Sequence, residues 1–339
     1  MTGGLDLTRD QVLAFRRRVG ALDQRLATGA SSLRRVGWAG LQDSMPRAAL
    51  LSIHARVREA SPTVWADESL VQVWGPRFST YVVPAQDRAV FTVGRLPVDP
   101  ARRQAAEDLA DRLDEVLDGR RLSYRDAGRA LGVHPSQLRY AAPTGRLLIR
   151  WEGAGRPQVW MVPRPDTDPE QARRELARRY LQVFAPGTTT GFEKWAGLTP
   201  GRAAPTFDAL RDSMVPVRTP TGGGWILAQD EEELRRTPAE PAAARLLPSG
   251  DAYYLLWGAD RDLLVPDPAH RAHLWTSRVW PGAVLVDGEV VGTWRRAAHL
   301  VTVTPWAPLP ARARRAVEAE AAVLPLPDLG RAVTVRWAD

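Results

Sequence analysis

Apolar residues in the first part of the chain recur at helical spacing and then at the two-residue spacing of strands. Helix-type patterns at 10–26 and 48–57 precede strand-type runs at 70–74 and 78–83. Hydrophobic spacing is the main sequence signal for each element, and helices followed by a two-stranded hairpin are typical of the winged-helix fold. We therefore predict a winged helix over residues 1–97.

The same order of elements recurs twice further along the chain. The second copy has helix-type patterns at 101–117 and 124–131 and a hairpin over 146–162. The third copy has a helix-type pattern at 169–184 and a hairpin over 215–228. Similar modules that repeat at domain spacing indicate a tandem array. The predicted boundaries of the three modules are 1–97, 98–167 and 168–232.

The pattern changes after an acidic, proline- and alanine-rich linker at 230–244. Beyond the linker, Asp287-Gly288 separates two apolar runs and predicts a two-residue hairpin turn. We expect a separate, mostly β domain over 245–339, folded as a small barrel. The predicted fold class is therefore α+β, with tandem winged-helix domains followed by a small C-terminal β-barrel-like domain. Five strand-type runs are predicted in this domain, at 253–257, 283–286, 290–294, 300–304 and 332–337.

A short polar loop at residues 40–47 leads into the apolar helical run that starts at Ala48 and places Gln42, Asp43 and Ser44 together. We expect Ser44 to cap the first turn of this helix, because a serine hydroxyl can accept from its free N–H groups. The positive end of a helix also favours an anion or a polarised water. The loop is therefore either an ordinary helix cap or a binding or catalytic site.

Composition excludes several classes of site. The chain has 339 residues, of which 44% are hydrophobic and 25% charged, as in ordinary globular proteins. It has no cysteine, which excludes disulfides, thiolate zinc sites, iron–sulfur clusters and cysteine nucleophiles. His270 and His273 lie three residues apart, but no third ligand follows at a recognisable spacing, so we expect no metal and no cofactor. No run is apolar enough for a signal peptide or a membrane span, and we expect a cytoplasmic, nucleoid-associated protein.

The charge of the chain favours a polyanionic partner. The formal net charge is +7, and Lys194 is the only lysine, so nearly all positive charge is guanidinium, which grips phosphates bidentately. Arginine runs such as 16–18 are expected to line a surface that tracks phosphates. The alternative for each candidate is a solvated surface residue. Gln137 and Arg139 lie in the second helix of the middle module, and Arg156 lies in its wing. The full set of candidate DNA-binding residues is Arg47, Arg77, Gln137, Arg139, Arg156, Arg202 and Arg295.

One set of segments occurs in a characteristic order along the chain: Gly40-Leu41-Gln42, 46–50, 70–76, 81–84, Leu247-Pro248, Asp251, Tyr254, Leu255, Arg261-Asp262, 284–288 and 291–295. Together these segments resemble the AlkZ/YcaQ-type winged-helix DNA glycosylases. The resemblance implies tandem winged helices and a β-barrel arranged around DNA. It also implies excision of bulky N7-alkylated purines and unhooking of interstrand crosslinks, in some members as self-resistance to a DNA-alkylating natural product.

The family's catalytic signature is a glutamine, an apolar residue, and then glutamine or aspartate. Gln42 matches the first position, whereas Asp43 stands at the apolar position and Ser44 at the second functional one. Tyr81 stands where the resemblance implies a histidine. The resemblance places the candidate catalytic residues at Gln42, Asp43 and Ser44.

The reaction that the resemblance implies requires few chemical groups from the protein. An N7-alkylated purine is already cationic and leaves without prior protonation, so the protein must stabilise an oxocarbenium-like sugar and position a water. Gln42 could orient that water, and Asp43 could accept its proton if it faces the DNA. A lyase would need a positioned amine. We interpret Lys194 as a surface residue, which favours a monofunctional glycosylase.

Three hypotheses follow. The first is a monomeric, monofunctional DNA glycosylase, a hydrolase that acts on damaged double-stranded DNA. The second is a non-catalytic DNA-binding protein that kept the scaffold and lost the chemistry. The third is a transcription regulator that uses the middle module. Gln42 and Asp43 both facing a basic concave surface would favour the first, and Asp43 held away from that surface would favour the second.

Overall fold

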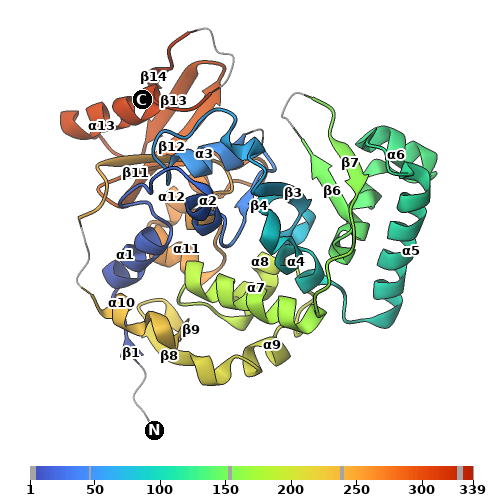
Figure 1. Ribbon diagram of the computed structural model, residues 1–339. Coiled ribbons are helices and arrows are strands. Elements are labelled where there is room, and N and C mark those ends of the chain that lie inside the picture. Colours follow the sequence, from blue (N-terminus) through green and yellow to red (C-terminus); the bar gives the residue numbers. More distant parts are fainter. Residues whose placement is uncertain (1–4, 46, 152–154, 237–239, 327–330, 339) are drawn as a thin grey trace.

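The computed structural model describes residues 5–45, 47–151, 155–236, 240–326 and 331–338 (Figure 1). Three three-stranded sheets and one five-stranded sheet are surrounded by helices, which confirms the mixed α+β class. Among the described residues, no helix is both long enough and apolar enough to cross a bilayer.

The first module is built around a sheet with the strand order β2-β4-β3. Strand β2 (Leu41–Gln42) pairs with β4 (Thr80–Pro84), and this register places Gln42 opposite Tyr81. The polar loop of the sequence analysis therefore begins as an edge strand. The other elements are α1 (Arg9–Val19), α2 (Ala30–Val36), α3 (Ala48–His54), η1 (Val64–Ala66), β3 (Leu70–Trp74), η2 (Pro76–Phe78), η3 (Ala85–Asp87), α4 (Arg88–Phe91) and η4 (Val93–Arg95).

The middle module has a sheet of order β5-β7-β6 beside the long helix α5 (Pro100–Leu117), drawn in green in Figure 1. The segment after His134 forms a 3-10 helix, η5 (Pro135–Thr144). This helix contains Pro143, which has no N–H for an α-helical hydrogen bond. The remaining elements are β5 (Leu122–Ser123), α6 (Tyr124–Ala130), β6 (Leu147–Arg150) and β7 (Gln158–Met161).

The third module takes its edge strand from the beginning of the chain. Strand β1 (Leu5–Asp6) pairs in parallel with β8 (Met214–Thr219), which gives the order β1-β8-β9. The N-terminal residues therefore join the third sheet and not the first. The other elements are α7 (Pro169–Val183), α8 (Thr189–Ala196), α9 (Ala204–Asp208), η6 (Arg211–Ser213), β9 (Gly222–Leu227), η7 (Ala228–Asp230) and α10 (Glu231–Arg235).

The C-terminal domain corrects two expectations. Its sheet is open, in the order β10-β11-β12-β13-β14, so the predicted barrel is wrong: β10 and β14 lie at opposite edges of the described sheet and do not pair. The predicted strand at 253–257 is also wrong, because its first residues form the 3-10 helix η8 (Ala252–Tyr254). Asp287 and Gly288 do form the hairpin turn, with φ of 48° and 82°. The other elements are β10 (Ala244–Leu247), α11 (Ala259–Leu264), α12 (Pro268–Leu274), β11 (Gly282–Val286), β12 (Glu289–Ala297), β13 (Leu300–Pro305), α13 (Ala311–Ala322) and β14 (Thr334–Trp337).

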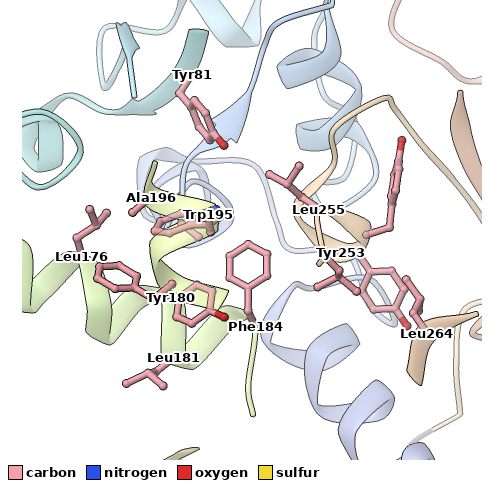
Figure 2. Packing of buried hydrophobic residues seen from close by; sticks show 14 of the residues in the cluster. Tyr81, Leu176, Tyr180, Leu181, Phe184, Trp195, Ala196, Tyr253, Leu255 and Leu264 are labelled. Atoms are coloured by element: carbon pink, nitrogen blue, oxygen red, sulfur yellow. The ribbon is translucent and has the colours of Figure 1, made fainter. Parts of the chain in front are cut away.

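The largest hydrophobic core is shared between modules (Figure 2). Tyr180, Phe184 and Trp195 of the third module pack on one another, with ring centroids 5.3 to 5.6 Å apart. Tyr81 of the first module and Tyr253 of the C-terminal domain belong to the same buried cluster. Because these rings leave water together, the modules hold fixed orientations and a site can form where they meet.

The arginine run at 16–18 does not line a phosphate-tracking surface, and that expectation is wrong. Arg16 and Arg17 are buried, and Arg16 also donates to the backbone carbonyl oxygens of Phe184 and Ala185. Helix α1 thus uses its cations to bind other segments of the same chain. The carboxylate partners of Arg16, Arg17 and Arg18, at 2.7, 2.8 and 2.6 Å, are Asp260, Asp23 and Glu233.

Candidate functional site

Gln42 lies where the first module, the third module and the C-terminal domain meet. Its Oε1 accepts hydrogen bonds from Arg77 Nη2 at 2.7 Å and from the Tyr81 hydroxyl at 3.4 Å. The amide also packs on Gly250, where an added Cβ would lie 3.0 Å from Gln42 Nε2. Among the described residues, Nε2 has no hydrogen-bond acceptor. The amide is therefore held by its oxygen, and its N–H groups remain available to a ligand.

Arg77 is held from several directions. Its Nη1 donates to the Trp195 carbonyl oxygen at 3.0 Å, and its guanidinium lies 4.9 Å from the Trp257 ring centroid. The backbone is left-handed, with φ of 54°, and passes so close to Gly197 that a Cβ there would lie 2.7 Å from Arg77 Cα. Arg77 is thus a fixed cation beside the Gln42 amide.

Asp43 points into the module. Only 4% of its surface is exposed; Oδ1 accepts from the Ala49 N–H at 3.0 Å and Oδ2 from Gln72 Nε2 at 2.6 Å. Neighbouring residues of an extended strand point opposite ways, so Asp43 faces inward while Gln42 faces the module junction. Burial raises the pKa of the Asp43 carboxyl to about 7, despite the hydrogen bonds that favour its charged form.

Ser44 does not cap helix α3, contrary to expectation. The N-cap residue is Arg47, with φ of 67° and no side-chain cap, and the carboxylate of Asp43 takes the Ala49 N–H instead. The Ser44 hydroxyl is buried and has no hydrogen-bond partner among the described residues. Buried hydroxyls are normally hydrogen-bonded, so this one indicates a place for a water or a ligand atom.

Gln72 is a site residue that the sequence analysis missed. Besides its bond to Asp43, its Oε1 accepts from the Trp151 backbone N–H at 2.6 Å and its Nε2 donates to the Trp151 carbonyl oxygen at 3.3 Å. Gln72 is buried and connects strand β3 to the end of the middle module's sheet. The available signal was a single amide inside the apolar run Leu70-Val71-Gln72-Val73-Trp74.

The structure brings two candidate DNA-binding residues of different modules together. Gln137 of η5 and Arg202, which precedes α9, line the same cavity. Arg139, also on η5, has its guanidinium 5.3 Å from the Tyr140 ring centroid. Arg156, near the tip of the middle hairpin, is exposed.

The other candidate cations lie toward the C-terminal domain. Arg295 is exposed on β12 and donates to the Val279 carbonyl oxygen at 3.0 Å. Arg47 lies close enough to Arg296 to help lower the pKa of that guanidinium, although burial is the larger cause. Arg77, by contrast, bonds directly to Gln42.

The described residues hold no cluster of three histidine, aspartate or glutamate side chains suited to a metal ion. His270 instead stacks on Trp306, with ring centroids 4.5 Å apart.

Residues 33–324 match the family model described as DNA glycosylase AlkZ-like. The chain belongs to the AlkZ-like DNA glycosylase family. The resemblance inferred from the sequence is thereby confirmed. The chain is 30% identical, over 159 residues, to an interstrand DNA cross-link repair glycosylase of Streptomyces sahachiroi; this match covers 46% of the chain and 42% of the relative's length.

The fold is also that of a solved AlkZ-like protein. The structure of Streptomyces sahachiroi DNA glycosylase AlkZ matches with a TM-score of 0.78 at 20% identity, covering 98% of this chain and 100% of that one. At this identity the similarity shows the shared fold, and the roles of individual residues depend on the geometry described above.

Replacing Asp43 by asparagine is expected to flatten the pH dependence of stability. The Asp43 pKa is about 7 in the folded protein and near the ordinary 3.8 of an aspartate when unfolded, so the folded state binds more protons between these values. The contribution of Asp43 to the free energy of unfolding therefore falls as pH rises from about 4 to 7, by at most about 4 kcal/mol. Urea unfolding at pH 5 and pH 8 should show a larger decrease for the unmodified protein than for Asp43→Asn.

Buried His54 titrates in the opposite direction and serves as the internal reference. Burial lowers its pKa to about 4, so its contribution to stability decreases as pH falls from about 6.5 through 4. This contribution is common to both proteins and cancels in their difference. Identical pH profiles for the two proteins would contradict the assignment of Asp43 as an ionisable buried group.

Proposed function

We propose that this chain is a monofunctional DNA glycosylase that hydrolyses the N-glycosidic bond of bulky N7-alkylated purines, including those in interstrand crosslinks. The main support is the state of Gln42. At the family's first catalytic position, its amide oxygen is held by Arg77 and Tyr81, and its N–H groups form no hydrogen bond with the described residues. The named relatives, a cross-link repair glycosylase and a DNA glycosylase, support the same reaction class.

The proposed reaction needs no acid to release the base. The C1′–N9 bond breaks, and its electron pair neutralises the cationic purine. A water oxygen then forms a bond to C1′ and releases a proton to solvent. We assign the Gln42 Nε2 N–H to hold this water, and the unpartnered Ser44 hydroxyl to be its second contact. Ser44 follows Gln42 by two residues, just beyond the end of β2, which keeps the two side chains close along the chain.

In this proposal Asp43 is a positioning residue. Its carboxylate binds the Ala49 N–H and the Gln72 amide, so it fixes the turn between β2 and α3 that presents Gln42 and Ser44. This role replaces the proton-accepting role considered from the sequence, which requires Asp43 to face the DNA.

We interpret the three three-stranded sheets and their helices as tandem winged helices that bind double-stranded DNA as a monomer. The boundaries 1–97, 98–167 and 168–232, and the C-terminal domain 245–339, are retained for this interpretation, with β1 as an exchange into the third sheet. Guanidinium groups distributed over several modules suit contacts to successive phosphates. The proposed DNA contacts are Arg47, Arg77, Gln137, Arg139, Arg156, Arg202 and Arg295.

A second candidate function is DNA binding without catalysis. The inward position of Asp43, and serine at the family's second functional position, favour it. Incubation with duplex DNA that carries one bulky N7-alkylguanine separates the two. Abasic sites, detected as strand breaks after alkaline cleavage, are expected for the glycosylase. Binding of the same duplex without product above the protein-free rate would support the non-catalytic candidate.

A further inference from the structure

A cavity of about 670 Å³ lies where the three modules meet, and its size is within the usual range of small-ligand sites. Its wall includes Phe78 of η2, Tyr140 of η5 and Arg202 of the third module. Phe78 follows Arg77 directly, and both have left-handed backbones, with φ of 54° and 55°. One residue of this turn is bonded to Gln42 and the next lines the cavity.

One wall of the cavity is aromatic and open to solvent. The rings of Phe78 and Tyr140 meet edge to face, with centroids 5.2 Å apart and planes at 77°. Tyr140 is 46% exposed, and Val98, also in the wall, is 49% exposed. An exposed aromatic platform beside exposed apolar surface is suited to stacking on a planar ring.

The cavity also carries buried positive charge. Arg95 donates to the carbonyl oxygens of Ala196 and Trp74, and Arg173, likewise buried, bonds only to backbone carbonyls. Among the described residues neither forms a direct ion pair, although the charges of Glu170 and Asp168 act on Arg173 from a greater distance. A buried cation without a direct ion pair is costly, so an anion bound beside Arg95 would relieve that cost.

Two further cations lie in the same wall and are exposed. Arg102 and Arg202 come from different modules. The carboxylate in the wall, Asp99, accepts from the Arg102 backbone N–H as a helix cap. Among the described residues, the guanidinium groups in the wall outnumber its one carboxylate. An anionic group there could therefore accept hydrogen bonds from both Arg102 and Arg202.

We propose that this cavity binds one unstacked nucleotide, with its base against Phe78 and Tyr140 and its phosphate at Arg102 and Arg202. The proposal rests on the proposed function, since it takes DNA as the partner. The exposed amide of Gln137 lines the same cavity and can hydrogen-bond the edge of a base. A nucleotide held on Phe78 would also hold the turn that places Arg77 at Gln42.

The test uses fluorescence anisotropy to compare the affinities of the protein for two labelled DNA duplexes. One duplex is fully paired, and the other has a single unpaired deoxyguanosine nucleotide. The protein is expected to bind the unpaired duplex about tenfold more tightly, in line with the worth of stacking one base on an aromatic ring. In Tyr140→Ala the ratio of the two affinities should fall to about one. Arg202→Ala should reduce it severalfold, and Val323→Ala, an exposed apolar residue outside the cavity, should leave it unchanged.

A second experiment measures whether the cavity binds a free nucleotide in place of a nucleotide of the DNA strand. Binding of dGMP that is lost in Tyr140→Ala, without any preference for the unpaired duplex, would support the cavity as a nucleotide site and overturn its use by the DNA strand. A preference that survives in Tyr140→Ala, or the absence of both effects, would overturn the proposal. Excision of N7-alkylguanine is measured with the same preparations. Excision without the preference rejects only this inference, and DNA binding without excision rejects only the proposed function.

Discussion

Replacing Gln42 by alanine is expected to slow excision of N7-alkylguanine at least about a hundredfold, with DNA affinity changed only a few-fold. One positioned hydrogen-bond donor at the reacting centre is worth about 10² to 10³ in rate. The change removes the only side-chain amide among the proposed catalytic residues. Single-turnover rates with excess protein would measure the chemical step separately from product release.

Gln42→Glu separates the two ends of the amide. A carboxylate keeps the acceptor that Arg77 and Tyr81 use, and it removes the Nε2 N–H groups. If Nε2 holds the water, Gln42→Glu should be as slow as Gln42→Ala. Retained activity in Gln42→Glu would contradict that assignment. Gln104→Ala is the matched control, because Gln104 is an exposed amide on α5 that bonds only to Asp108.

Replacing Asp251 by alanine is expected to reduce the free energy of unfolding by about 3–5 kcal/mol, because it leaves the buried Arg56 cation without its partner. The two side chains are 0% and 4% exposed and share two hydrogen bonds of 2.7 Å. The Ser52 hydroxyl donates a third bond of 2.7 Å to the carboxylate. These bonds join helix α3 and the segment just after it to the C-terminal domain, one residue from the Gly250 that packs on Gln42. Urea unfolding at neutral pH measures the loss.

An exposed ion pair provides the comparison for Asp251→Ala. Asp6 and Arg218 are bonded at 2.9 Å, and both side chains are largely exposed, so Asp6→Ala should leave the free energy of unfolding almost unchanged. Replacing Arg56 and Asp251 together by apolar residues should recover part of the loss, because no buried charge is then left unpaired. Equal costs for Asp6→Ala and Asp251→Ala would show that the buried pair adds nothing specific.

Local pattern was sufficient for the regular elements whose signal lies within a few residues. The strand predicted at 70–74 is β3 without change, and the helix predicted at 169–184 ends one residue earlier. Local pattern could not predict whether the C-terminal sheet is open or closed into a barrel. Closure depends on pairing between edge strands distant in sequence, whereas periodicity reports only which face of each strand is buried.

In the candidate site, too, local features were predictable and contacts between distant segments were not. Gln42 was identifiable from its motif, but the direction of Asp43 depends on the register of β2 against β4, and its partner Gln72 is 29 residues away. The arginines of α1 were misassigned because a charge run carries no information about distant carboxylates. The sequence places Gln137 and Arg202 in different modules. The packing of these modules brings both side chains to one cavity.

The contacts of helix α1 bear on how the chain is made. Arg16, Arg18 and the preceding strand β1 bind Asp260, Glu233 and Val217. Residues 5–19 therefore find these partners only after more than two hundred further residues have been synthesised. Pairings so far apart close slowly, so this segment is expected to dock late and to stay exposed to proteases and chaperones in the nascent chain.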